Sequence, residues 1–455
     1  MRCLLMGGFL FSIFGQIAST TLFGIELTID PIGRQAIRGW GFTPGPLDWD
    51  GRNMLRDRDL MDQIYRQSGV SIVRLVLGTG GIFWEEKGGI NADRTKAILF
   101  PQILALTESG VREYIISMVV PPSVMRKYRS DESYVELDPN ELRSEREDAY
   151  VAFLTSLIDL IAKEKLPLPR AMSFQAQPDR PSEGYFGSTS FPGCPYSPEQ
   201  WKRVGAKLRA ALDGAGFSVV GILGPETYGH SWFSRAFKGS RTDETTTLAF
   251  LSGVAFNSTG TGDEKAKKDE VFQAVLNDTH KAGREIWITN YNLEKASDDT
   301  AVLLETFAGM RTDLVEYRAD YWFWRYAFTW DIGAESLVQG RNHIETPTYR
   351  ALRVLWNAVP PGAEVHAVHP TRFDFPAFAL VTKSRTFAVL VNRGPKPEIV
   401  AFRGILASGA AQYTFTNDRT PDVQALKSTT GVWSARVPTR SVSFLVFAHL
   451  ASPNK

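Results

Sequence analysis

The sequence has 455 residues, of which 43% are hydrophobic and 12% aromatic, so the chain can bury a large core and is not globally disordered. Its 51 Lys and Arg residues balance 50 Asp and Glu residues, and the formal net charge is +1. This balance offers no basic surface for a phosphate backbone, so we expect no nucleic-acid partner.

Residues 1–20 are typical of a secretory signal peptide. Arg2 supplies an early positive charge, an apolar run follows over residues 3–14, and small residues occupy positions 18–20. The apolar run is too short to cross a bilayer, and a buried N-terminal helix is the alternative. We therefore expect a secreted, extracellular protein without a membrane span. After cleavage Cys194 would be its single cysteine, which excludes an intramolecular disulfide.

Residues 36–350 alternate short β-rich runs with longer amphipathic runs. Helical spacing of apolar residues is clear in Glu141–Lys163 and Pro198–Asp213. A doubly wound open sheet is the rival, but Gly39–Phe42 is followed by Pro44 rather than by a phosphate-binding turn and a helix. Eight strand–helix units predict an α/β fold, a (β/α)8 TIM barrel. The predicted strands are Ala36–Phe42, Ser71–Leu77, Glu113–Val120, Ala171–Gln177, Val219–Glu226, Gly253–Asn257, Glu285–Asn290 and Tyr321–Trp330.

The pattern changes after a helix predicted over Tyr349–Val359. Residues 364–449 alternate polar and apolar side chains without a helical stretch, which is typical of an antiparallel β-sandwich. We place this C-terminal β-sandwich domain at residues 351–455. Residues 21–35 include a similar alternation. We expect them to form an N-terminal strand that joins this sandwich.

Polar side chains at the carboxyl ends of the barrel strands are the first candidates for a site, because loops from different strands converge there. Gln177 and Asn290 place an amide at the ends of two predicted strands. Other polar residues at predicted strand ends are Arg74, Ser117, Gln175, Asp179, Glu226 and Asn257.

Five stretches resemble, in order and spacing, the motifs of glycoside hydrolase family 30, a family of retaining (β/α)8-barrel glycosidases. Ala36–Gly41 resembles its glycine-flanked opening strand, and Met118–Arg126 resembles the Pro-Pro motif of strand three. Gln175–Asp179 resembles Gln-Asn-Glu-Pro-Asp, and Ile286–Tyr291 resembles Trp-x-Thr-Glu-Tyr. Pro347–Ala363 resembles the passage into the C-terminal sandwich.

The resemblance implies an impaired active site. In the family, a Glu on strand four protonates the leaving oxygen and a Glu on strand seven attacks the anomeric carbon; here these positions are Gln177 and Asn290. An amide supplies neither a proton near neutral pH nor an anionic nucleophile, and general acid–base catalysis alone is worth roughly 10²–10⁴ in rate. Ala176 replaces the family's Asn that contacts the sugar 2-hydroxyl. We expect a divergent member that binds a β-linked oligosaccharide or polysaccharide with little or no hydrolysis.

Two alternatives stay open. The first is an active O-glycosyl hydrolase of the endo-β-glycanase type that uses displaced carboxylates. Glu226 would then act as the acid while Asn290 orients an N-acetyl group, and Asp179 and Glu183 lie just past strand four. The second is a structural or protein-binding module with a vestigial cleft.

Aromatic rings near the strand ends are candidates for sugar stacking. Trp322 and Trp324 share one face of a strand, so both point into the barrel or both point against the helices. His366 and His369 lack a cysteine or carboxylate that would complete a metal site, and we predict no metal or cofactor. The predicted substrate-binding residues are Gln175, Ala176, Asp179, Trp232, Tyr291, Trp322 and Trp324, with Trp84 as a further aromatic candidate.

Overall fold

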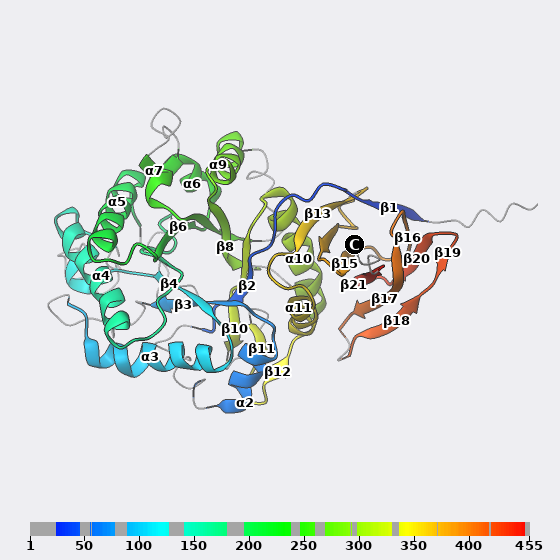
Figure 1. The fold of residues 1–455 in the computed structure, drawn as a ribbon, viewed down its shortest axis with the longest axis horizontal. Coiled ribbons are helices and arrows are strands. Elements are labelled where there is room, and N and C mark those ends of the chain that lie inside the picture. Colours follow the sequence, from blue (N-terminus) through cyan, green and yellow to red (C-terminus); the bar gives the residue numbers. More distant parts are fainter. Residues whose placement is uncertain are drawn as a thin grey trace, which may run out of the picture.

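The chain forms a (β/α)8 barrel followed by a β-sandwich, which confirms the predicted fold class (Figure 1). The predicted signal peptide, Trp84 and Glu183 lie outside the residues that the structure describes. The computed structural model describes residues 24–45, 55, 57–77, 89–126, 141–179, 195–237, 246–259, 269–291, 293, 298–329, 336–370, 372–417 and 420–450.

Eight parallel strands close the barrel, and each overlaps one of the predicted strands. The first strand pairs with both the second and the last, so the sheet has no edge and the rival open sheet is wrong. The barrel strands are β2 (Gly39–Phe42), β3 (Ile72–Leu77), β4 (Glu113–Met118), β5 (Ala171–Ser173), β6 (Gly221–Thr227), β7 (Gly253–Ser258), β8 (Glu285–Tyr291) and β9 (Tyr321–Trp324).

Large aromatic rings fill the interior near the amino ends of the strands. Trp287 and Tyr321 stack with ring centroids 3.6 Å apart. Glycines make room for them: a Cβ atom at Gly41 would lie 2.5 Å from the ring of Phe323 and 2.8 Å from a backbone oxygen. This part of the barrel is therefore a packed core with no room for a ligand, and a binding site is expected at an end of the barrel.

Amphipathic helices cover the barrel, and side-chain caps fix the start of several of them. Asn91, Ser197, Asp269, Asp298 and Thr346 each accept a hydrogen bond from a first-turn backbone N–H. The helices are α2 (Arg58–Met61), α3 (Ala92–Glu108), α4 (Glu147–Lys163), α5 (Pro198–Gly214), α6 (His230–Phe237), α7 (Thr246–Phe250), α9 (Glu270–Lys281), α10 (Asp299–Arg311) and α11 (Pro347–Ala358). Short helical turns are η1 (Asp62–Arg66), η2 (Ser123–Met125), η3 (Ser144–Arg146) and η4 (Thr312–Glu316).

The passage out of the barrel differs from the predicted one. The strand predicted over Tyr321–Trp330 is interrupted at Arg325, because β9 ends at Trp324 and a new strand begins at Tyr326. The chain then forms a small sheet of β10 (Tyr326–Thr329), β11 (Ser336–Gln339) and β12 (Ile344–Glu345). Helix α11 straddles the predicted boundary at residue 350 and packs on the barrel, since the ring of Trp356 lies 6.3 Å from that of Phe42.

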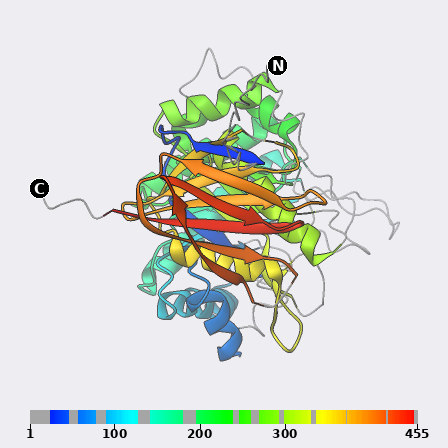
Figure 2. The ribbon, with the colours of Figure 1, turned by 90° about the vertical axis from the view of Figure 1, so that its right-hand side faces the viewer.

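The C-terminal domain is one mostly antiparallel, ten-stranded sheet that folds back on itself, so that its two halves face each other across an apolar core (Figure 2). Strand β1 (Ile25–Ile29), which precedes the barrel in sequence, pairs antiparallel with β13 and parallel with β16. The other strands are β13 (Glu364–His369), β14 (Ala377–Val381), β15 (Arg385–Asn392), β16 (Glu398–Arg403), β17 (Ala407–Phe415), β18 (Asp422–Leu426), β19 (Ser428–Thr429), β20 (Val432–Val437) and β21 (Ser441–His449).

The two domains share an apolar interface. Phe307 on α10 and Phe444 on β21 pack edge to face, with ring centroids 5.4 Å apart, and Phe415 lies 4.9 Å from Phe444. Arg393 pairs with Glu305 at the border of this contact. The half of this sheet that contains β21 is thus covered by α10 on one face and by the other half of the sheet on the opposite face (Figure 1).

Truncation of the central ring should test this interface. We expect Phe444→Ala to lower the free energy of unfolding by about 3–5 kcal/mol, because a fully buried ring is replaced by a cavity between the domains. Urea denaturation followed by tryptophan fluorescence measures the change. Val423→Ala, at a position 53% exposed on β18, is the control and should stay within about 0.5 kcal/mol. Equal effects of the two substitutions would contradict the interface.

Candidate active site

A layer of polar side chains lies above the aromatic core, toward the carboxyl ends of the strands. Arg74 on β3 and Glu226 on β6 form a buried ion pair with a distance of 3.1 Å between Nε and Oε1. Ser117 on β4 donates to the same Oε1 at 3.1 Å and accepts from Arg74 Nε at 2.9 Å. Since Glu226 has no exposed surface, this network fixes its carboxylate inside the barrel.

A bulge in β6 turns Glu226 into this position. Pro225 pairs with Ala255 and Thr227 pairs with Phe256, so Glu226 is an extra residue in the ladder. Its φ of 48° lies in the left-handed region, which a non-glycine residue occupies at a cost. Its contacts with Arg74 and Ser117 offset that cost.

The end of β5 adjoins Glu226. Gln177 also has a positive φ, 55°, and its backbone N–H donates to the carbonyl of Glu226 at 3.1 Å. The N–H of Ala176 donates to the carbonyl of Met118 at 2.7 Å. These bonds tie the chain after β5 to both neighbouring strands and hold Gln177 at the barrel mouth, whereas Gln175 is buried.

A second bulge positions Asn290. Ile288 pairs with Trp322 and Tyr291 pairs with Trp324, which leaves one extra residue in β8. Ile288 and Tyr291 both pack in the outer core, so Thr289 and Asn290 lie between two outward-facing neighbours. Both are buried, and Asn290 pairs in register with Asn257 on β7.

The strand ends therefore form a continuous arc from Gln177 through Glu226 and Asn257 to Asn290. Several buried polar atoms on this arc have no hydrogen-bond partner among the described residues. They are Gln177 Oε1, Glu226 Oε2, both amide atoms of Asn257 and Thr289 Oγ1. Each such atom costs about 1–3 kcal/mol, and a cluster of them is typical of a site that a polar ligand or water completes.

Among the described residues, Glu226 is the one acid whose side chain lies at the barrel mouth. Asp179 lies nearby, but its carboxylate accepts the backbone N–H groups of Tyr228 and Gly229. It ties the chain after β5 to the chain after β6. Asp179 therefore has a structural role, and we leave it out of the site.

The predicted aromatic contacts lie elsewhere. Trp322 donates to Asp313 at 2.8 Å, and the hydroxyl of Tyr291 donates to the carbonyl of Glu305 at 2.7 Å. The rings of Tyr291, Trp322 and Trp324 form a buried cluster against the helices. Successive side chains of a strand point to opposite faces, and Tyr321 and Phe323 point into the barrel interior.

Trp232 is likewise buried among other side chains rather than exposed at the barrel mouth. It packs edge to face on Trp201 between α5 and α6, and its Nε1 donates to the carbonyl of Tyr196 at 3.1 Å. Of the two directions expected for Trp322 and Trp324, the structure shows the one against the helices. All four rings are buried, so they are not part of the site that we propose. Across the described residues, no three His, Cys, Asp or Glu side chains gather as a metal site would require.

Asp313 is a buried acid behind the arc that the sequence did not single out. It accepts hydrogen bonds from Ser258 at 2.7 Å and from Trp322. Burial raises its pKa to about 7, against the lowering effect of these two bonds. Folding thus favours its neutral form.

Asp313 should make stability depend on pH. Between about pH 5 and pH 7 the folded state holds a proton that the unfolded state has lost, so stability falls as pH rises through this window. Asp313→Asn lacks this titration. We expect the stability of the wild type relative to Asp313→Asn to fall by up to about 2 kcal/mol over that range.

Denaturation of both proteins at several pH values measures the effect. Asp59→Asn, at an exposed position on α2, is the control and should leave the pH profile of the wild type unchanged. Parallel profiles for wild type and Asp313→Asn would contradict a raised pKa at Asp313.

Comparison with solved structures identifies the fold. A family 30 subfamily 8 xylanase from Clostridium acetobutylicum matches with a TM-score of 0.71 at 17% identity, over 93% of this chain and 100% of that chain. Xylanase C from Talaromyces cellulolyticus gives 0.70 at 16% identity, over 93% and 99%.

An endo-β-1,6-glucanase gives a TM-score of 0.65 at 14% identity, over 93% of this chain and 94% of that chain. No protein-family model and no curated protein matched the sequence. The described part of the chain contains no helix long and apolar enough to cross a membrane. At these identities the comparisons establish a fold like that of family 30 glycoside hydrolases.

Proposed function

We propose that this protein is a secreted carbohydrate-binding relative of the family 30 glycosidases. It holds a β-linked oligosaccharide or polysaccharide at the carboxyl end of the barrel and hydrolyses it slowly or not at all. The observation that carries this proposal is the arc of strand ends, where amides occupy the fourth and seventh barrel strands and Glu226 is the single described acid.

The arc suits a neutral polyhydroxyl ligand. Sugar hydroxyls both donate and accept hydrogen bonds, and the free atoms on the arc include acceptors on Gln177 and Glu226. Asn257 offers a donor and an acceptor, and Thr289 offers a hydroxyl. A bound sugar would satisfy these buried groups, which is a source of both affinity and specificity.

The same arc lacks the groups for a retaining mechanism. That mechanism needs two carboxyls about 5 Å apart, one protonated and one ionised. Glu226 is held by Arg74 and Ser117, and the arc places no second carboxyl beside it among the described residues. Gln177 and Asn290 supply neither role.

Displaced carboxylates remain the second candidate function, and the buried free oxygen Oε2 of Glu226 is the observation that favours it. Under that hypothesis the unmodified protein turns over a glycan, and Glu226→Gln abolishes the turnover. A vestigial cleft with a structural or protein-binding role predicts that a glycan array retains no specific sugar.

Restoring the two glutamates should test the loss of chemistry. We expect no turnover by the wild type on xylans, β-1,6-glucans, β-1,6-galactans or glucosylated lipids. Gln177→Glu combined with Asn290→Glu should raise the rate on a bound substrate by about 10² or more, because general acid and nucleophile return together. Release of reducing sugar measures the rate.

Each single substitution is the matched control and should gain much less, since the mechanism needs both groups. Ala176→Asn can be added to restore the 2-hydroxyl contact. Robust hydrolysis by the wild type would refute the proposal.

Thr289 should show a trade-off between stability and binding. Its buried hydroxyl has no partner among the described residues, so Thr289→Val should stabilise the protein by about 1 kcal/mol and weaken glycan binding. Calorimetric melting and titration with the glycan found on an array measure the two effects. Thr306→Val is the control, because that hydroxyl donates to the carbonyl of Val302 at 2.6 Å. It should lose stability and keep the affinity.

A further inference from the structure

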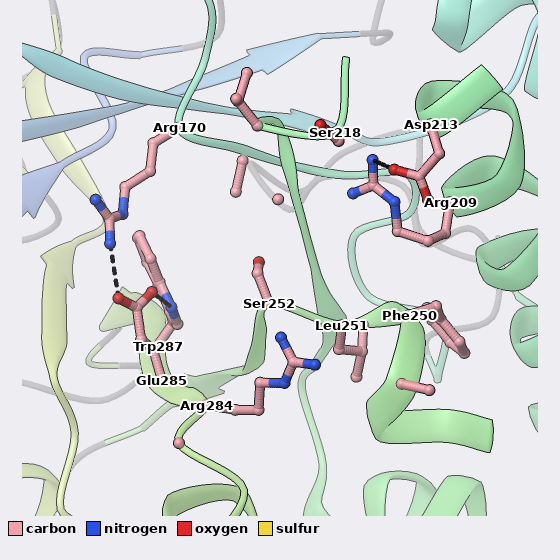
Figure 3. A pocket seen from close by; sticks show the side chains of 15 residues that line it. Arg170, Arg209, Asp213, Ser218, Phe250, Leu251, Ser252, Arg284, Glu285 and Trp287 are labelled. Carbon is pink, nitrogen blue, oxygen red and sulfur yellow. Dashed lines mark hydrogen bonds and ion pairs between the residues drawn. The ribbon is translucent and has the colours of Figure 1, made fainter. Parts of the chain in front are cut away.

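A second pocket lies at the opposite end of the barrel, where β5 to β8 begin (Figure 3). It encloses about 470 Å³, which is within the size range of small-molecule sites. The first residues of four strands or their neighbours border it, namely Ala171, Gly221, Ser252 and Glu285. It is therefore separated from the arc of strand ends by the aromatic core.

Two of the three arginines in this pocket are engaged. Arg170 pairs with Glu113 at 2.9 Å and with Glu285 at 2.7 Å. Arg209 pairs with Asp213 at 2.7 Å and donates to the carbonyl of Val220 at 2.7 Å. Figure 3 shows the guanidinium of Arg170 beside Glu285 and that of Arg209 beside Asp213.

Arg284 differs from both. Its guanidinium forms no ion pair or hydrogen bond with any of the described residues, and in Figure 3 it projects between Ser252 and Leu251. The lining contains three arginines and two acids, Asp213 and Glu285, and a third acid, Glu113, pairs with Arg170 from outside the lining. Arg284 is thus the arginine of this pocket that has no acidic partner among the described residues. A free guanidinium in a concave site suits a carboxylate, with which it forms two parallel hydrogen bonds.

The rest of the lining limits the ligand to one negative charge. Asp213 and Glu285 would repel a second charge, and the carboxyl ends of α5 and α9 lie next to the pocket and carry partial negative charge. Leu251 and Phe250 supply an apolar wall. Ser252 donates its hydroxyl to the carbonyl of Ile222 at 3.0 Å, so its oxygen can still accept a bond from a ligand hydroxyl.

We propose that this pocket binds a small organic monoanion through its carboxylate, with Arg284 as the anchor. Two sources share this chemistry: a free carboxylic acid and a uronic acid. The site is distinct from the carbohydrate arc, so its existence does not depend on the function proposed there.

The test uses the full chain, titrated with sodium glucuronate, sodium butyrate, inorganic phosphate and methyl glucoside and followed by isotope-labelled protein NMR. We expect saturable binding of the two carboxylates, competition between them, and weaker binding as salt is raised. Tighter binding of glucuronate would identify a uronic acid as the source, and tighter binding of butyrate a free acid. Arg284→Gln should weaken both at least tenfold, and Arg284→Lys should weaken them less.

Arg341→Gln removes an exposed arginine outside the pocket and should leave the affinities unchanged. The proposal is overturned by any of four results: no saturable binding of either carboxylate, equal affinity in Arg284→Gln, tighter binding of phosphate than of carboxylates, or equal binding of methyl glucoside. Glycan binding at the carboxyl end, measured in Arg284→Gln, should be retained. Loss of carboxylate binding at the amino end can thus be distinguished from loss of glycan binding at the carboxyl end.

Discussion

The ion pair between Arg74 and Glu226 governs the carboxyl end of the barrel. Two charges with almost no access to water are tolerable only because they face each other and share Ser117, so strands β3, β4 and β6 are held in one arrangement. The carbonyl of Glu226 also accepts the N–H of Gln177, which extends the constraint to β5. One interaction thus decides which polar atoms face the barrel mouth.

The fold was accessible from the sequence because the hydrophobic runs of a barrel are nearly continuous and its helices carry clear caps. The side-chain directions at the strand ends were not. Period-two alternation places Trp322 and Trp324 on one face but does not say which face points inward. The bulges at Glu226 and in β8 shift the alternation by one residue, and nothing in the local sequence marks them. Gln177 and Asn290 were found as polar residues at predicted strand ends and received their roles from the family resemblance, whereas Asp313 and Arg284 belong to no motif.

The two ends of the barrel differ in which polar groups are paired and which lack a partner among the described residues. At the carboxyl end the charges are paired and the neutral amides are left without partners. At the amino end Glu285 and Asp213, the two acids that line the pocket, are paired, and the guanidinium of Arg284 has no partner among the described residues. The aromatic layer around Trp287 and Tyr321 keeps these two environments apart. The two ligands that we propose, a neutral glycan and an organic monoanion, would therefore not compete directly for one site.

Strand β1 carries a consequence for biosynthesis. It leaves the ribosome before any part of the barrel, yet its ladder partners, such as His369 for Thr28, are made more than three hundred residues later. Until then the backbone of β1 lacks its hydrogen-bond partners, and its apolar face, which includes Leu27, lacks the core that buries it. A strand that is made before the barrel is thus among the last to find its ladder partners, and the nascent chain must be shielded from mispairing while the barrel is completed.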